Sequence, residues 1–218
     1  MATEMRVFDN KDEWLKHRNK IGGSDAGVIL GLSKWKDNLT LYREKLDLIP
    51  TPDLSDNPLV QYGIRTEPLI RAIVINHHPE WSVGYFENNI ISNTKYPFAH
   101  ASLDGWIEDS DGRKGVLEIK TAELSSKLKS EEWADNHIPD TYFAQLLHYM
   151  MVTEFDFAIL CAELKTYRAD GSVEWRIIER RIDRSEVEED IKYLEEKERE
   201  FWKCLQERRE PGRKLPSI

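Results

Sequence analysis

The sequence predicts an α/β domain, because segments with helical and with strand-like patterns follow one another along the chain. Helical patterns dominate residues 10–78, strand-like runs dominate residues 81–121, and the remainder mixes both. Such mixed element orders are typical of sheets covered by helices. With 218 residues, 40% of them hydrophobic, the chain can bury one good core, so a single domain over residues 1–218 is expected.

The N-terminal part predicts three helices separated by turn residues. The first covers residues 10–20. The second follows a Gly-Gly turn, is capped by Ser24 or Asp25, and ends near Leu30. The third lies at residues 40–46, and a loop rich in Pro, Asp and Ser follows it.

A long helix is predicted for residues 57–78, which carry apolar residues at helical spacing. Pro68 lies inside this pattern. Because proline removes a backbone donor and clashes with the preceding turn, we expect a kink or two helices in series. Strand-like runs follow at residues 81–86 and 89–93.

Two apolar runs joined by a polar Asp/Gly cluster predict a β-hairpin in the middle of the chain. The first run covers residues 101–108 and the second covers residues 115–121. Residues 109–112, between them, have the composition of a hairpin turn.

Three charged side chains of this hairpin are expected to converge. Asp104 and Glu118 can meet across the strands, and alternation places Glu118 and Lys120 on one face while Ile119 turns into the core. Buried unpaired charge costs several kcal/mol, so the arrangement indicates a divalent cation between the carboxylates and a water held by the lysine. This is metal-assisted phosphodiester chemistry. Taken alone, the same spacing also fits a hairpin with solvated charges on its outer face.

The C-terminal part predicts a helix at residues 139–151, a buried strand at 155–164 and a hairpin to a further strand at 173–182. A capping box that begins at Ser185 opens the last helix. Residues 122–138 show no clear period and predict an irregular loop.

Composition excludes several classes of protein. The net charge of −9 argues against a protein that coats nucleic acid, although a local basic groove is compatible with it. No run approaches the roughly 20 apolar residues of a membrane span, and the first residues lack the apolar stretch of a secretory signal. Cys161 and Cys204 lack metal-site spacing and read as free thiols in a reducing compartment. We expect a cytoplasmic protein without a membrane partner.

Four segments, in this order, resemble the phage lambda exonuclease and YqaJ-type viral recombinase nucleases of the PD-(D/E)xK superfamily. They are Arg18 with residues 21–26 and 30–33, residues 63–68, the Asp104/Glu118/Lys120 hairpin, and residues 142–145 with 147–149. The resemblance spans about residues 18–151. It implies a restriction-endonuclease-like core, with a central mixed β-sheet flanked by helices.

The resemblance also assigns roles at the predicted site. It implies the catalytic set Glu67, Asp104, Glu118, Lys120 and Gln145. It implies the metal ligands Glu67, Asp104, Glu118 and the backbone carbonyl of Ile119. These oxygen donors suit Mg²⁺, and Mn²⁺ should substitute for it. Lys120 would position or deprotonate the attacking water. Without the resemblance, Glu67 reads as a surface glutamate and Gln145 as a polar residue on a core helix.

Arg18 and Ser24 form the implied pocket for a terminal 5′-phosphate. A Gly-Gly-Ser turn that leads into a helix exposes backbone N–H groups where the helix dipole favours an anion. An arginine on the preceding helix adds a bidentate phosphate donor. Ser24 could instead only cap its helix.

Further DNA contacts are expected from Lys34, Trp35 and Lys36, which interleave phosphate-contacting and base-stacking side chains. A plain surface loop explains these three residues equally well. Tyr142 is expected to reach the site from its helix, and His148 reads equally well as a core histidine.

The implied function is a Mg²⁺-dependent exonuclease that digests linear double-stranded DNA from 5′ ends by two-metal hydrolysis, leaving 3′ single-stranded tails for recombination. A homotrimeric ring around DNA, a single-strand annealing partner, and a phage or prophage gene in a bacterial host are implied too. Two alternatives stay open: a PD-(D/E)xK endonuclease of repair or restriction type, and a catalytically inert DNA-binding protein. An iron–sulfur nuclease is disfavoured, because two cysteines cannot supply four thiolates.

Overall fold

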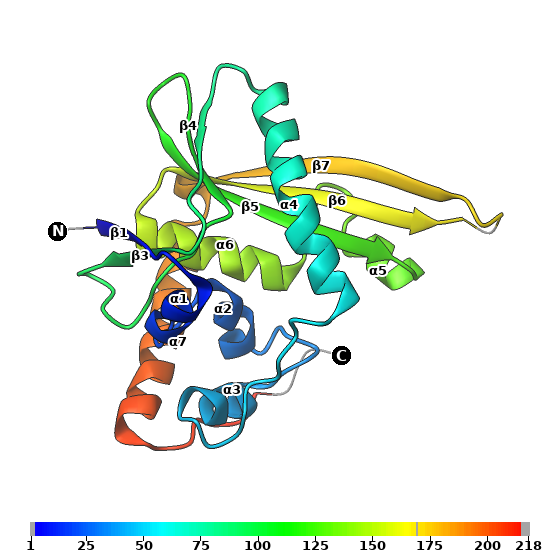
Figure 1. Cartoon of the computed structure of the whole chain (residues 1–218). Coiled ribbons are helices and arrows are strands. Elements are labelled where there is room, and N and C mark those ends of the chain that lie inside the picture. The colour runs from blue at the N-terminus through cyan, green and yellow to red at the C-terminus, as the bar shows by residue number, and fades with distance from the viewer. Residues whose placement is uncertain (1–2, 169, 215–218) are drawn as a thin grey trace.

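A five-stranded mixed β-sheet with the order β2-β4-β5-β6-β7 lies at the centre of the chain (Figure 1). The computed structural model describes residues 3–168 and 170–214. The strands are β2 (Ser82–Gly84), β4 (Gly105–Glu108), β5 (Lys114–Leu124), β6 (Phe157–Tyr167) and β7 (Val173–Asp183). β5 and β6 run parallel, and the other neighbours are antiparallel. The sheet flanked by helices is the fold class that the sequence predicts.

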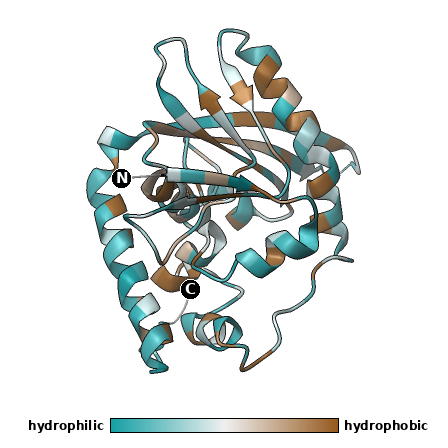
Figure 2. Cartoon of the chain, turned by 60° about the vertical axis from the view of Figure 1, so that its left-hand side comes forward, coloured by the Kyte–Doolittle hydropathy of each residue, from teal (hydrophilic) through white to brown (hydrophobic). Residues whose placement is uncertain are grey.

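Helices cover both faces of this sheet. They are α1 (Lys11–His17), α2 (Gly23–Leu30), α3 (Asn38–Lys45), α4 (Pro58–His77), α5 (Lys127–Glu131), α6 (Asp140–Thr153) and α7 (Glu188–Glu207), with a 3₁₀ turn η1 (Arg184–Glu186) before α7. α4 packs against β5 and β6 on one face, whereas α6 covers the other face and also packs against α2 and α7. Figure 2 shows brown, white and teal residues mixed along the sheet strands and α7 largely teal, as expected for a solvated outer helix.

Because side chains alternate along β5, they lie in two separate apolar cores, one on each face of the sheet. Leu117 and Ile119 pack against Ile70 and Val74 of α4. Val116 packs in the larger core on the α6 side of the sheet. Both faces of β5 are therefore covered, which explains why its residues 115–119 are buried although Glu118 among them is charged.

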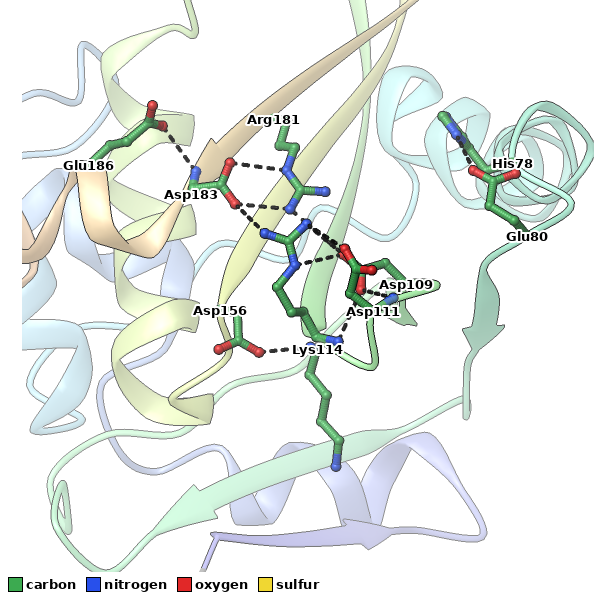
Figure 3. Close-up of polar contacts among 10 residues, drawn as sticks. His78, Glu80, Asp109, Asp111, Lys114, Asp156, Arg181, Asp183 and Glu186 are labelled. Atoms are coloured by element: carbon green, nitrogen blue, oxygen red, sulfur yellow. Dashed lines mark hydrogen bonds and ion pairs between the residues drawn. The ribbon is translucent and has the colours of Figure 1, made fainter.

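The predicted hairpin turn between β4 and β5 is held by Asp109 (Figure 3). The buried Asp109 carboxylate accepts the backbone N–H groups of Asp111 at 3.1 Å and Arg113 at 3.0 Å, and it also accepts Arg113 Nε at 3.0 Å. Gly112 adopts a φ of 75°, which a glycine reaches without strain. Arg113 Nη1 lies 3.6 Å from Asp183 at the end of β7. The turn residues thus fix the register of the hairpin.

α4 is one continuous helix, and neither Pro68 nor another residue divides it into two. Pro68 is exposed, as is Ile64, whose carbonyl loses its helical donor at this proline. Water can satisfy that carbonyl on the solvent side. The expectation of two helices in series is therefore wrong.

The expectation of an irregular loop at residues 122–138 is wrong for most of residues 122–131, whereas residues 132–138 are turns and irregular backbone as expected. β5 continues to Leu124, which pairs with Thr166 of β6. Ser126 then caps α5, and Trp133 is buried beyond it. These elements depend on pairing with distant segments, which a local period does not report.

Two smaller features differ from the prediction at the ends of the chain. β1 (Thr3–Val7) pairs with β3 (Asn89–Asn93) in a separate two-stranded sheet that the sequence does not predict. The capping box involves Asp183 and Glu186 and opens η1 rather than α7.

Among residues 3–168 and 170–214, every helix is too short or too polar to span a membrane. Both cysteines are buried free thiols, as expected.

A buried ion pair joins α6 to α7. His148 Nδ1 lies 2.7 Å from Glu198 Oε1, and both side chains are fully buried. His148 Nε2 lies 2.9 Å from the carbonyl of His100. Burial lowers the pKa of His148, but the Glu198 carboxylate outweighs burial and raises it above 6.5. Of the two interpretations of His148, the core histidine is confirmed.

We expect Glu198→Gln to lower the free energy of unfolding by about 3 kcal/mol near pH 6, because it leaves buried His148 without its charged partner. The loss should shrink as pH rises. The stabilisation linked to a raised folded pKa of His148 is complete below its unfolded value, about 6.5, and disappears as pH passes the folded pKa.

Denaturant unfolding between about pH 5.5 and about pH 9 measures this loss. Glu196→Gln is the matched control, because Glu196 is exposed on the same helix and its pair with Lys197 should contribute under about 1 kcal/mol. A Glu198→Gln loss that stays constant or grows with pH would contradict the expectation.

Candidate active site

Asp104 and Glu118 face each other at the end of the hairpin opposite its turn. The β4–β5 register pairs Gly105 with Leu117, and its continuation by one residue sets Asp104 opposite Glu118. Asp104 Oδ2 accepts the backbone N–H of Ile119 at 2.8 Å. Asp104 directly precedes β4 rather than lying within a strand, and this backbone contact orients its carboxylate.

Glu118 is the most deeply buried charged group of the site, with 1% of its surface exposed. Its Oε1 accepts hydrogen bonds from Lys120 Nζ and, at 2.7 Å, from Gln145 Nε2. Its Oε2 is buried without a hydrogen-bond partner among the described residues. Strand alternation on β5 and one residue of α6 thus bring three of the predicted side chains together.

Glu67 approaches the site from α4 together with an arginine that the sequence analysis missed. Arg71, one turn later, binds the Glu67 carboxylate. Arg71 Nε also donates to the backbone carbonyl of Asp104 at 2.7 Å. The i,i+4 spacing of Glu67 and Arg71 was the available signal for this pair. The arginine therefore joins α4 to the segment that carries Asp104.

The three carboxylates disfavour each other's charge. Burial, and then the nearby Asp104 charge, raise the pKa of Glu118 to about 8. The same two causes raise the pKa of Glu67 to about 7. Burial lowers the pKa of Lys120, but the charges of Glu118 and Asp104 outweigh it and raise that pKa. A site with this electrostatic character favours an added cation.

The donor set fits a hard divalent cation. Carboxylate oxygens of Asp104, Glu118 and Glu67 suit Mg²⁺ or Mn²⁺, and the buried, unpartnered Glu118 Oε2 is an oxygen that a cation would satisfy. The Ile119 carbonyl belongs to the same strand. However, within residues 3–168 and 170–214 no three His, Cys, Asp or Glu side chains form a preformed cage. The carboxylates would have to exchange present partners such as Arg71 to hold a metal.

Tyr142 lies beside the charged cluster. Lys120 Nζ is 5.3 Å from the centroid of its ring, which is within the range of a cation–π contact. The Trp133 ring is 5.7 Å from the Tyr142 ring. The structure thus brings Tyr142 to the site.

A hydrogen-bonded chain connects the cluster to α2. Gln145 Nε2 donates to Tyr149 Oη at 2.9 Å. The Tyr149 ring packs directly against Gly23, where an added Cβ would lie 2.5 Å from it. The start of α2 can approach α6 this closely only because residue 23 has no side chain.

Arg18 lies near this chain. Its guanidinium carbon is 4.3 Å from the Trp14 ring centroid. The charge of Arg18 contributes to lowering the pKa of His100, which burial lowers to about 2. It also opposes the rise in the pKa of Tyr149, which burial causes. Arg18 is the C-cap residue of α1.

Ser24 is exposed in the first turn of α2 and does not cap it. The N-cap position is Gly22, and the Asp25 carboxylate accepts the Gly22 N–H at 2.9 Å. Asp25 also pairs with Lys45 at 2.7 Å. Neither Ser24 nor Asp25 is the N-cap residue of α2, so the predicted cap is wrong; Asp25, in the first turn, instead accepts the N–H of the N-cap residue Gly22.

The predicted DNA contacts at residues 34–36 differ from one another. Lys34 pairs with Glu132 at 2.7 Å, and Lys36 pairs with the buried Glu44. Trp35 is 95% exposed between them. Both lysines are therefore paired with carboxylates, and the Trp35 ring is the side chain of this segment that is open to solvent.

Comparisons with known proteins identify the family and the fold of the chain. The model of the YqaJ-like viral recombinase domain matches residues 13–156. The chain is 34% identical over 156 residues to "Uncharacterized protein YqaJ" of Bacillus subtilis (strain 168). This match covers 66% of the chain and 42% of that relative, so the chain spans about two fifths of the relative's length.

Among solved structures, the fold is similar to an alkaline exonuclease (LHK-Exo) from Laribacter hongkongensis, with a TM-score of 0.64, 21% identity and coverage of 91% of this chain and 94% of that one. LHK-Exo in complex with dAMP matches with a TM-score of 0.62, 21% identity and the same coverages. A phage-related exonuclease from Haemophilus somnus 129PT matches with a TM-score of 0.51, 18% identity and coverages of 90% and 99%. These likenesses show the restriction-endonuclease-like fold.

We expect Gly23→Ala to lower the free energy of unfolding by about 1–3 kcal/mol, because the new methyl group would overpack the Tyr149 ring. Gly63→Ala is the matched control: the added methyl group would meet only Thr121 Oγ1 at 3.5 Å, and alanine is the better helix former. Denaturant unfolding of both variants tests this. Wild-type stability of Gly23→Ala would contradict the close approach of α2 to Tyr149.

Proposed function

The chain belongs to the YqaJ-like viral recombinase family, and from this premise we propose that it is a metal-dependent 5′-to-3′ exonuclease. It digests linear double-stranded DNA and leaves 3′ single-stranded tails for recombination, with residues 1–218 acting as one exonuclease domain. The observation that carries the proposal is the convergence of Asp104, Glu118 and Lys120 on one sheet face, with Glu67 reaching it from α4.

The cofactor that fits is Mg²⁺, with Mn²⁺ as a substitute. Glu67, Asp104, Glu118 and the Ile119 carbonyl would hold it, in the two-metal arrangement that the family resemblance implies. When bound, such ions supply Lewis-acid polarisation of the phosphodiester and a nucleophilic water at neutral pH.

The side chains of the site do the remaining work. Lys120, beside two carboxylates, keeps its proton, so it positions the water and offsets the charge of the transition state. Gln145 fixes the orientation of Glu118 through the 2.7 Å bond to Oε1. Arg71 holds Glu67 and the Asp104 backbone in place. These contacts hold Glu118, Glu67 and the Asp104 backbone near one another, and Glu67 would exchange its Arg71 contact on metal binding.

Recognition of the DNA end falls to Arg18 and Ser24. Ser24 is exposed at the start of α2, where backbone N–H groups and the helix dipole favour a phosphate. Because Tyr149 packs against Gly23 and binds Gln145, this pocket adjoins the catalytic groups. A terminal 5′-phosphate held there would explain a preference for 5′ ends.

We also propose a homotrimeric ring and a single-strand annealing protein as partner, both as the resemblance to the lambda exonuclease family implies. A ring suits an acidic chain of net charge −9, since positive charge is then needed only on the inner wall. Trp35 and Tyr142 are proposed DNA contacts. The gene would be of phage or prophage origin, and the enzyme would act in the cytoplasm of the bacterial host.

With Mg²⁺, we expect the protein to digest linear duplex DNA and to leave closed circles intact, and a chelator should stop digestion. Lys120→Ala should slow digestion by at least about 100-fold, because a charge-stabilising donor is lost, while DNA binding persists. Lys192→Ala, on the exposed face of α7, is the control. Gel assays of both DNA forms decide between the alternatives: nicked or linearised circles indicate an endonuclease, and no loss of either form indicates an inert binding protein. Digestion by folded Lys120→Ala at the wild-type rate would refute the catalytic assignment.

We expect faster digestion of 5′-phosphorylated than of 5′-hydroxyl ends. Arg18→Ala should remove most of this preference, since a charge-assisted hydrogen bond contributes about 1.5–3 kcal/mol, which is about 10- to 150-fold. Arg18→Lys should restore it only in part, because an ammonium lacks the bidentate geometry. Lys16→Ala, exposed on the same helix, is the control. Initial rates on paired substrates measure the effect, and a preference that survives Arg18→Ala in full would remove the support for a 5′-phosphate pocket.

A further inference from the structure

One exposed aromatic side chain lies beside the catalytic cluster. Tyr85 follows β2 and is 36% exposed. The β2–β4 register pairs Gly84 with Trp106, so its continuation sets Tyr85 opposite Gly105, the residue after Asp104. Phe86, the next residue, is 51% exposed and turns to the other face of the sheet, towards Trp106.

The Tyr85 and Phe86 rings each pack against one neighbouring side chain. The guanidinium carbon of Arg71 lies 3.6 Å from the centroid of the Tyr85 ring, and Arg71 is itself fixed by its bond to the Asp104 carbonyl. The Phe86 ring lies 5.4 Å from the Trp106 ring. Trp106 in turn covers Gly84, where a Cβ would meet its ring at 2.2 Å.

The backbone that carries the two rings is fixed as well. Asn89 Nδ2 donates to the carbonyl of Phe86 at 2.8 Å and to the carbonyl of Leu103 at 2.9 Å. Asn89 Oδ1 accepts the N–H of Leu103 at 2.9 Å. One buried amide therefore ties the aromatic loop to the segment that leads into Asp104.

We propose that the Tyr85 ring is an aromatic shelf on which a nucleobase of the substrate strand stacks while its backbone lies at Asp104 and Glu118. The proposal rests on the nuclease function proposed above. A base fits better than a protein partner, because one side chain falls far short of the roughly 800 Å² that each partner buries in a stable protein interface. Stacking tolerates every base, as an exonuclease that digests any sequence requires.

The charges of the neighbouring carboxylates also favour a neutral contact for the DNA strand at this position. The neighbouring carboxylates repel a phosphate until cations bind, so a neutral, flat contact next to them can hold the strand without adding to that repulsion. Because Arg71 covers one side of the Tyr85 ring, only the remaining exposed surface is open to a base. The rigid support lowers the entropy lost on stacking.

The test combines Tyr85→Ala with DNA that carries a single abasic site, placed in turn at each of about the first six nucleotides from the 5′ end. At one position, the abasic site should lower kcat/KM of the wild type about tenfold, the scale of one lost stack. Tyr85→Ala should show the same loss on intact DNA and no further loss with the abasic site. Tyr85→Phe should keep the ring and most of the activity.

Two further variants separate stacking from folding. Tyr85→Leu keeps apolar cover over Arg71 but has no π face, so it should behave as Tyr85→Ala. Tyr193→Ala removes another exposed tyrosine, from α7, and should behave as wild type. The shelf is refuted if Tyr85→Ala and the abasic site lower kcat/KM independently at every position, so that their fold-losses multiply. It is also refuted if Tyr85→Leu digests DNA at the wild-type rate.

A binding experiment keeps the shelf separate from the nuclease assignment. In Lys120→Ala, DNA with 2-aminopurine at the sensitive position (or scanned over the same nucleotides if no digestion occurs) should lose fluorescence on binding, and the added Tyr85→Ala should restore it. Quenching that Tyr85→Ala leaves unchanged overturns the shelf alone. A wild type that digests no DNA overturns the nuclease function, and the quenching result then still decides the shelf.

Discussion

The burial of one carboxylate, Glu118, is the constraint on which the rest of the structure depends. A buried charge costs several kcal/mol unless it is paired and hydrogen-bonded. β5 therefore has to present Lys120 two residues later, and α6 has to place Gln145 over the sheet. α2 has to approach α6 at Gly23, because the Tyr149 ring that binds Gln145 fills that space.

The parts of the site that the sequence predicts are those fixed by local rules. The period of two along β5 is enough to set Glu118 and Lys120 on one face with Ile119 on the other. The turn composition around Asp109 is enough to bring Asp104 opposite Glu118. The same rules predict the long helices and the mixed sheet, since periodicity and turn residues are properties of short segments.

The parts that could not be predicted depend on contacts between distant segments. Arg71 is unremarkable on α4 until the fold brings the Asp104 carbonyl to it. Lys34 reads as a phosphate contact until α5 brings Glu132, 98 residues away, within 2.7 Å. The hydrogen bonds of Asn89 could not be predicted either, because the carbonyls of Phe86 and Leu103 meet its side chain only once the fold has formed.

The division of the interior into two cores has a mechanical consequence. Glu67 lies on α4, which packs on Leu117 and Ile119 at one face of β5, whereas Gln145 lies on α6 at the other face of the same sheet. The relative position of Glu67, Glu118 and Gln145 thus depends on how both helices pack against β5. A displacement of about 1 Å between reacting groups can lower a rate about 100-fold, while losing one methyl group from either core costs only about 1 kcal/mol of stability. Turnover should therefore report small packing defects in this protein more sensitively than its melting temperature does.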